Sequence, residues 1–238
     1  MRHRAVAPVF VVLLGSALAG AGDLTIRQRV SGTGEPNGPR EETQYLTATK
    51  RITDSVDARL IIDLDTQTML VATKPKKSYQ VLTFDEIRQQ TQALRTRFES
   101  LPPDAKKMLP DFDGEVTVKP TGKTDTLLGH PAKQYAVASG LATGDIWVTD
   151  DLIPPGDVVA WQTAMTTMSG PHGPGGKLAA ALAQLKGLPL KSTFTTNVGP
   201  TNKMTVVTEV LEVTTAAPPA SALAVPAGFE KAAPRAHP

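Results

Sequence analysis

The sequence contains no cysteine among its 238 residues, and only 5% of the residues are aromatic. The absence of cysteine excludes a disulfide framework, thiolate metal sites, a cysteine nucleophile and a lipid-modified cysteine at the start of a mature chain. Hydrophobic residues make up 40% and charged residues 20%, which excludes a transmembrane bundle and a wholly disordered chain. Because proline (20) and glycine (19) are plentiful, we expect many turns between short elements.

The N-terminal residues have the features of an export signal. Arg2 and Arg4 precede an unbroken apolar run from Val9 to Leu14, and the small residues Ala17-Leu18-Ala19 follow. This order is typical of a cleavable signal peptide, and the run is shorter than the about 20 apolar residues that a spanning helix needs. We therefore predict a signal peptide at residues 1–19 and a protein that is periplasmic or secreted. An N-terminal membrane anchor is the alternative.

Removal of this segment leaves a chain with balanced charge. The remaining 219 residues carry 23 basic and 23 acidic side chains. No basic excess is left to attract nucleic acid or anionic lipid. We expect no nucleic-acid partner and no stable membrane insertion after cleavage.

Strand patterns dominate the rest of the chain. Leu24, Ile26 and Val30 alternate with polar residues, which predicts a strand with one apolar face. Short segments rich in Thr, Val and Ile follow as far as Phe84, with links too short for crossover helices. This spacing predicts an antiparallel meander.

The C-terminal third predicts a hairpin and then a tail. Residues 190–198 and 204–213 are strand-like and flank a polar turn. Residues 214–238 are rich in Ala and Pro, so we expect an irregular tail in which Leu223–Pro226 docks at a sheet edge. With no linker-like break before it, we predict one domain over residues 20–213.

Three segments have helical periodicity. The first has a capping-box pattern at Thr83 and Glu86 and stops at Pro102. The second spans Val158 to Met168, and the third follows Leu178, Leu182 and Leu185. In the first helix we expect one apolar stripe to face the sheet: Phe84, Ile87, Leu94, Phe98 and Leu101.

Motifs that carry chemistry are incomplete. Gly173–Lys177 lacks the first Gly and the final Ser or Thr of a phosphate loop, and the acidic stretch at Asp63 lacks the Glu of a calcium loop. His130 has no second histidine at metal-ligand spacing, and no Gly-x-Ser-x-Gly elbow exists. We expect no catalytic residue, no metal and no cofactor. A hydrolase built from scattered Asp, Ser and His residues is one alternative.

Several strand ends and turns carry a family resemblance over nearly the whole mature chain. The segments are 63–69, 76–79, 129–135, 145–149 and 225–229. They resemble exported bacterial proteins of the family known as domain of unknown function 4412, which is similar in pattern to the lipoprotein-carrier (LolA/LolB-like) superfamily. The resemblance implies an α+β fold: a curved, incompletely closed antiparallel sheet, or half-barrel, with helices across its concave face. It carries over no functional residue.

By analogy with those carriers, the resemblance implies a lipid or another apolar ligand between sheet and helices. Trp and Met suit adaptable apolar surfaces, so the second helix supplies candidates for the lip of such a site. The candidate ligand-binding residues are Trp147, Trp161, Met165, Met168, Leu94 and Phe98. Two other interpretations stay open: the stripe is ordinary core, or the protein is an envelope scaffold with an unknown protein partner and no cavity.

Overall fold

The computed structural model describes residues 22–33, 35, 38–102, 115–140, 142–169, 174–182, 184–197 and 203–232. The predicted signal peptide at residues 1–19 lies outside the described residues, as do residues 233–238 of the predicted tail and the first residue of the 173–177 loop. Within the described residues, no helix is both long and apolar enough to cross a membrane.

Strands and helices follow one another in the order that the sequence predicts. The strands are β1 (Leu24–Ser31), β2 (Arg40–Leu46), β3 (Lys50–Ser55), β4 (Ala58–Asp63), β5 (Thr68–Thr73), β6 (Ser78–Thr83), β7 (Thr117–Leu127), β8 (His130–Ala138), β9 (Ala142–Thr149), β10 (Leu188–Asn197), β11 (Lys203–Thr214) and β12 (Glu230–Lys231). The α-helices are α1 (Phe84–Glu99), α3 (Val158–Ser169) and α4 (Pro174–Leu182), and the short 3₁₀ turns are η1 (Lys74–Lys76) and η2 (Ala220–Ala222).

All twelve strands form one open sheet in the order β12-β6-β5-β4-β3-β2-β1-β11-β10-β9-β8-β7. Strands β1–β6 form one antiparallel meander, because strands that follow one another in the sequence are also neighbours in the sheet. Strands β7–β11 form a second in the same way, with α3 and α4 in the connection between β9 and β10. The pairing of β1 with β11 joins the two meanders, and β12 adds to β6 in parallel. The predicted meander, the β10–β11 hairpin and the α+β half-barrel are confirmed.

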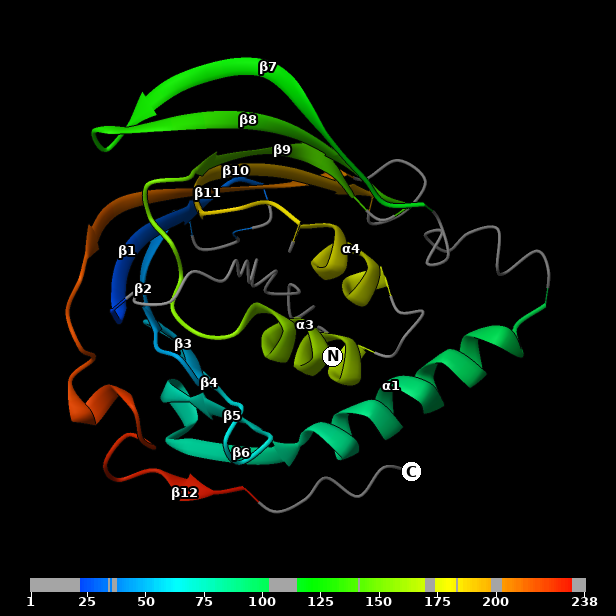
Figure 1. The fold of residues 1–238 in the computed structure, drawn as a ribbon. Helices are drawn as coiled ribbons and strands as arrows, with labels where there is room; N and C mark the ends of the chain where they lie inside the picture. Colours follow the sequence, from blue (N-terminus) through cyan, green and yellow to red (C-terminus); the bar gives the residue numbers. More distant parts are fainter. Residues whose placement is uncertain are drawn as a thin grey trace.

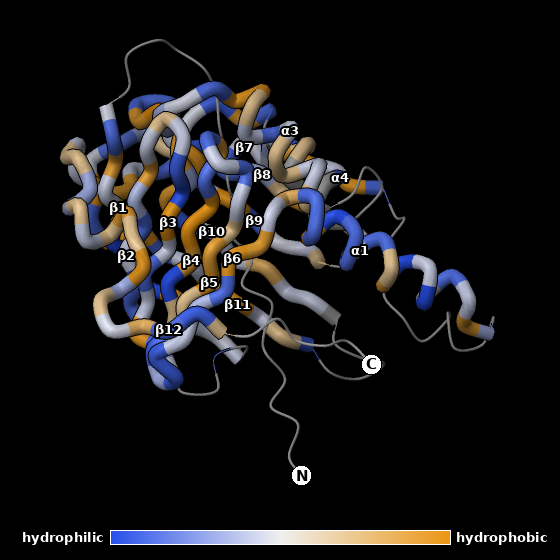
Figure 2. The backbone as a smooth tube through the Cα atoms, turned by 90° about the horizontal axis from the view of Figure 1, so that it is seen from below, coloured by the Kyte–Doolittle hydropathy of each residue, from blue (hydrophilic) through white to orange (hydrophobic). Residues whose placement is uncertain are grey.

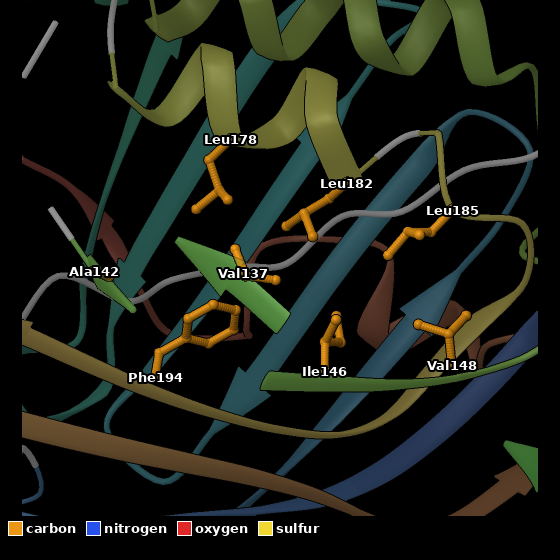
Figure 3. Close-up of a cluster of buried hydrophobic side chains, with 8 residues drawn as sticks. All are labelled: Val137, Ala142, Ile146, Val148, Leu178, Leu182, Leu185 and Phe194. Atoms are coloured by element: carbon orange, nitrogen blue, oxygen red, sulfur yellow. The ribbon is translucent and has the colours of Figure 1, made fainter. Parts of the chain in front are cut away.

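The sheet curves around two of the helices, and α3 and α4 lie on its concave side (Figure 1). Figure 3 shows three leucines, two of α4 (178 and 182) and one just after it (185), pointing toward Val137, Ile146 and Phe194 of the sheet. Leu182 is 2% exposed and Ile146 is fully buried. This half of the concave face is therefore packed core. Burial of one such leucine stabilises the fold by about 1.5–3 kcal/mol.

Helix α1 begins on the sheet and ends away from it. Its predicted capping box is confirmed: Thr83 Oγ1 accepts a hydrogen bond from the Glu86 amide at 3.1 Å, and Glu86 Oε2 accepts one from the Thr83 amide at 2.7 Å. Phe84 is 5% exposed, but Leu94 is 54% exposed. The expectation that Leu94 faces the sheet is wrong, because α1 runs past the sheet edge and projects from the body in both views (Figures 1 and 2).

The C-terminal segment after β11 is largely irregular, as predicted, and covers part of the convex face (Figure 1). It runs along the outside of the sheet from β11 to β12 (Figure 1). Arg59 on β4 donates from Nη1 to the carbonyl oxygens of Ser221 (2.6 Å) and Ala224 (3.2 Å). Because this clamp holds 221–224 over the convex face, Leu223–Pro226 does not fill the sheet edge. Glu230–Lys231 does, so the ordered fold extends beyond residue 213.

Candidate functional site

Helix α3 presents the predicted Trp and Met stripe to the concave face. Asp157 caps the helix, because its Oδ1 accepts a hydrogen bond from the Val159 amide at 2.7 Å. Trp161 (4% exposed) and Met168 (7% exposed) then pack in one cluster with Ile62 of β4 and Phe84 of α1. Met165 is only partly buried at the side of this cluster. The stripe is thus largely core, with one residue at its margin.

A buried arginine fastens this cluster to the sheet. Arg51 of β3 pairs with Leu46 and Ile62, so it belongs to the concave face. Its guanidinium lies 4.5 Å from the ring centroid of Trp161, within the range of a cation–π interaction. Nη1 donates to the Thr47 carbonyl oxygen at 2.8 Å, and Nη2 donates to that of Pro155 at 2.7 Å.

No carboxylate among the described residues forms an ion pair with Arg51, which is 4% exposed. Burial lowers the pKa of Arg51 to about 10, so the side chain keeps its charge at neutral pH. Trp161 Nε1 donates to the Ala48 carbonyl oxygen at 3.2 Å. These bonds join the β2–β3 turn to the start of α3, and the close approach requires glycine: a Cβ at Gly156 (φ +100°) would lie 2.3 Å from the Ala48 oxygen.

Beside α3, the concave face offers apolar side chains that the helices cover only in part. Register places Met69 and Leu82 next to Ile62, and Leu60 and Val71 in the neighbouring row across β4 and β5. All four are partly exposed, whereas Ile62 is 4% exposed. We call Leu60, Met69, Val71 and Leu82 the concave apolar block. It lies next to the first turns of α1 and to Met165.

Buried polar groups also lie on the concave face of β1 and β2, which β3 separates from the concave apolar block. Gln28 Nε2 donates to Glu42 Oε1 at 2.6 Å, and Arg40 Nε lies 3.5 Å from Glu42 Oε2. Gln28 and Glu42 are each 6% exposed. Neither residue is among the candidates predicted from the sequence, although Gln28 stands at an inward position of the Leu24–Val30 alternation. A polar residue at such a position is a signal of interior hydrogen bonding.

Two of the other candidate residues do not join this site, and a third is not described. Trp147 stands in β9 between Ile146 (fully buried) and Val148 (2% exposed), both of which face α4. Because side chains alternate along a strand, Trp147 belongs to the convex face, opposite Gln134 and Lys191 in register. The proposal of Trp147 as part of a lip under the helices is therefore wrong. Leu94 lies on the projecting part of α1, and the side chain of Phe98 is outside the described part.

The titratable groups that a hydrolase would use lie on the surface as separate pairs. His130 Nδ1 is 3.3 Å from Asp151 Oδ2, and Lys133 Nζ donates to Asp150 Oδ2 at 2.6 Å. Within the described ranges, no serine hydroxyl hydrogen-bonds His130. The same ranges contain no group of three or more His, Cys, Asp and Glu residues that could hold a metal ion.

The fold and this site define a protein with an open antiparallel sheet whose concave face is lined and partly covered by helices. The chain belongs to the family described as Domain of unknown function (DUF4412), whose model matches residues 36–229. No curated protein matches the sequence. The family match takes in β2 to β11, all the described helices and the C-terminal segment as far as residue 229, and it leaves out β1 and β12.

Solved structures are similar only at a distance. Two crystal forms of PNGF-II align with TM-scores of 0.40 and 0.43 at 14% identity, over 84% and 89% of this chain. The alignments cover 30% and 31% of PNGF-II, so this chain spans less than a third of that protein. A LolA superfamily protein from Nitrosomonas europaea aligns with a TM-score of 0.27 at 6% identity, over 83% of this chain and 87% of that one. At such TM-scores these likenesses carry no functional argument.

Proposed function

We propose that this protein is a non-enzymatic exported protein that binds a lipid or another apolar ligand between the concave face of its sheet and helices α1 and α3. The observation that carries the proposal is the concave apolar block. Val71, in the row of Leu60, and Leu82, in the row of Met69, extend these two apolar rows beyond the cluster that α3 closes. Apolar surface left in a concavity gains free energy when a ligand removes it from water, at about 25 cal/mol per Å².

The composition of the surroundings supports a ligand site. Binding pockets are mostly apolar with a few fixed polar groups. Here Arg51 of β3, the strand next to the block, holds Trp161 in place, and Gln28 and Glu42 hold one another further along the same side, on β1 and β2. Polar side chains fixed in this way orient a ligand without rearrangement on binding.

The test compares the parent with a variant that places a charge in the block. Native mass spectrometry of protein purified gently from the cells that express it, followed by organic extraction, should find a bound apolar molecule. Val71→Glu should lose that molecule, because binding would bury an unpaired carboxylate. Val159→Glu is the matched control, since Val159 is 68% exposed on α3.

Three results would contradict the proposal. The first is parent protein that carries no ligand and whose tryptophan fluorescence ignores added fatty acids and phospholipids, which favours the envelope scaffold. The second is Val71→Glu protein that keeps the ligand as well as Val159→Glu does. The third is turnover of ester, peptide or glycoside substrates that disappears in His130→Ala, which favours a hydrolase.

Export is part of the same proposal and rests on the basic, apolar and small residues of the first 19 positions. We expect a soluble periplasmic or secreted protein without a nucleic-acid partner. Intact-mass measurement of the protein from the cell envelope should show a chain that begins at or near residue 20. Recovery of the chain with Met1 still present would contradict export through a cleaved signal peptide.

A further inference from the structure

Polar side chains on the concave face continue the concave apolar block toward the middle of the sheet. Thr53 of β3 pairs with Leu60 of that block on one side and with Gln44 of β2 on the other. Thr53 lies two residues from Arg51, and Gln44 lies two residues from Glu42, so all four point to the concave side. We call Glu42, Gln44 and Thr53 the concave polar patch.

Part of this patch is buried without a hydrogen-bond partner. Thr53 is 9% exposed, and its hydroxyl group makes no hydrogen bond with any described residue. The side-chain amide of Gln44, which is partly exposed, has no such partner in the described part of the chain either. Buried polar groups are nearly always hydrogen-bonded, and a free one needs an explanation. A hydroxyl and an amide each donate and accept, so they suit a ligand group that does both.

The charge beside these two side chains disfavours an anion. The Glu42 carboxylate is buried, accepts a hydrogen bond from Gln28 and lies 3.5 Å from Arg40 Nε. Arg40 also forms an ion pair with Glu35, so two carboxylates share one guanidinium. The excess negative charge raises the free energy of a further anion nearby, and the effect is strong where water is excluded.

The other buried cation of this face, Arg51, is directed away from the patch. Its hydrogen bonds go to the carbonyl oxygens of Thr47 in the β2–β3 turn and of Pro155 before α3, and the ring of Trp161 covers it. From Arg51, the β2–β3 turn and Thr53 lie in opposite directions along β3. An anion on the polar patch would therefore meet the Glu42 carboxylate rather than this guanidinium.

We propose that the ligand of the concave face is an amphiphile with an uncharged polar group. Its apolar chain lies on the concave apolar block, and its polar group hydrogen-bonds Gln44 and Thr53. This inference rests on the proposed function and names the chemistry of its ligand. Neighbouring strands are about 4.8 Å apart, so β3 and β6 are about 14 Å apart along the sheet. An extended acyl chain of medium length spans this distance.

Equilibrium dialysis against an equimolar mixture of glycerol monolaurate and laurate tests the inference. The two amphiphiles share one acyl chain, and only laurate is anionic. Full-length protein, expressed with its own leader and processed by the cell, should bind glycerol monolaurate about tenfold more tightly, because laurate brings a further anion next to Glu42. Thr53→Val removes the hydroxyl at nearly unchanged volume. It should lower the affinity for glycerol monolaurate about fivefold, the effect of one hydrogen bond, and leave the affinity for laurate unchanged.

Two further variants separate the polar group from the charge. Thr43→Val is the matched control, since Thr43 precedes Gln44 in β2 and points to the convex side, and it should leave both affinities unchanged. Glu42→Gln keeps an acceptor for Gln28 but removes the charge, so it should raise the affinity for laurate. Urea denaturation should find Thr53→Val at least as stable as the parent, because this variant loses no hydrogen bond to a described residue.

Equal binding of the two amphiphiles by the parent would overturn the inference, as would tighter binding of laurate; both results would leave the proposed function standing. A preference for glycerol monolaurate that neither Thr53→Val nor Glu42→Gln changes would also overturn the inference, because the polar patch would then not be its cause. Binding of neither amphiphile would contradict the proposed function itself.

Discussion

Replacement of Arg51 by methionine tests whether the buried arginine holds α3 to the sheet. The change removes two hydrogen bonds from a charged donor to the Thr47 and Pro155 carbonyl oxygens. Such bonds contribute about 1.5–3 kcal/mol each, and the contact with the Trp161 ring adds about 1–2 kcal/mol. Against these losses stands the desolvation of the charge. The fall of the Arg51 pKa to about 10 corresponds to about 3 kcal/mol.

The balance predicts that Arg51→Met lowers the free energy of unfolding by about 3 kcal/mol, within a range of about 1–5 kcal/mol. Urea denaturation followed by circular dichroism measures it. Trp147→Phe as background leaves Trp161 as the sole tryptophan, and its emission should shift to the red as water reaches the ring. Arg27→Met is the control, since Arg27 has two ion-pair partners at 3.2 Å but lies in solvent.

The control variant should unfold close to the parent, because water screens exposed ion pairs. If Arg51→Met and Arg27→Met unfolded at the same urea concentration, burial of the guanidinium would not matter and the reasoning would fail. A red shift without loss of stability would show that Trp161 is loosened but that α3 is held elsewhere.

Four further variants can be tested by calorimetry or urea denaturation. Leu182→Ala should cost about 2–5 kcal/mol, because it opens a cavity between α4 and the sheet, while Leu94→Asp should cost less than about 0.5 kcal/mol at its exposed position. Gly156→Ala should destabilise the start of α3, since the new Cβ meets the Ala48 carbonyl oxygen. Burial raises the pKa of Asp54, but the hydrogen bonds and charges of Arg59 and Lys74 outweigh burial and hold this pKa below its usual value. As the pH falls, the Asp54 carboxylate therefore takes up a proton in the unfolded chain before it does so in the folded protein. The free energy of unfolding should decrease as the pH drops below about 4, and Asp54→Asn should make this decrease smaller.

Local features of the fold could be predicted because neighbouring residues determine them. The capping box at Thr83 and Glu86 joins atoms three residues apart, and the β10–β11 hairpin needs only a polar turn between two strands. The stripe of α1 likewise follows from its period. Whether the sheet covers the stripe depends on where the sheet ends. Phe84 lies over the sheet and is buried, while Leu94 lies beyond the sheet edge and is exposed.

The candidate site could be predicted only where periodicity was enough. Trp161 and Met168 face inward because they share a helical face with Ala164. Trp147 is different. Its neighbours Ile146 and Val148 both point to the concave side, and because side chains alternate along a strand, Trp147 points to the convex side. The orientation of Trp147 could have been predicted from the sequence alone, whereas the burial of Arg51 could not. Its burial depends on carbonyl oxygens of a turn and a loop about 100 residues apart.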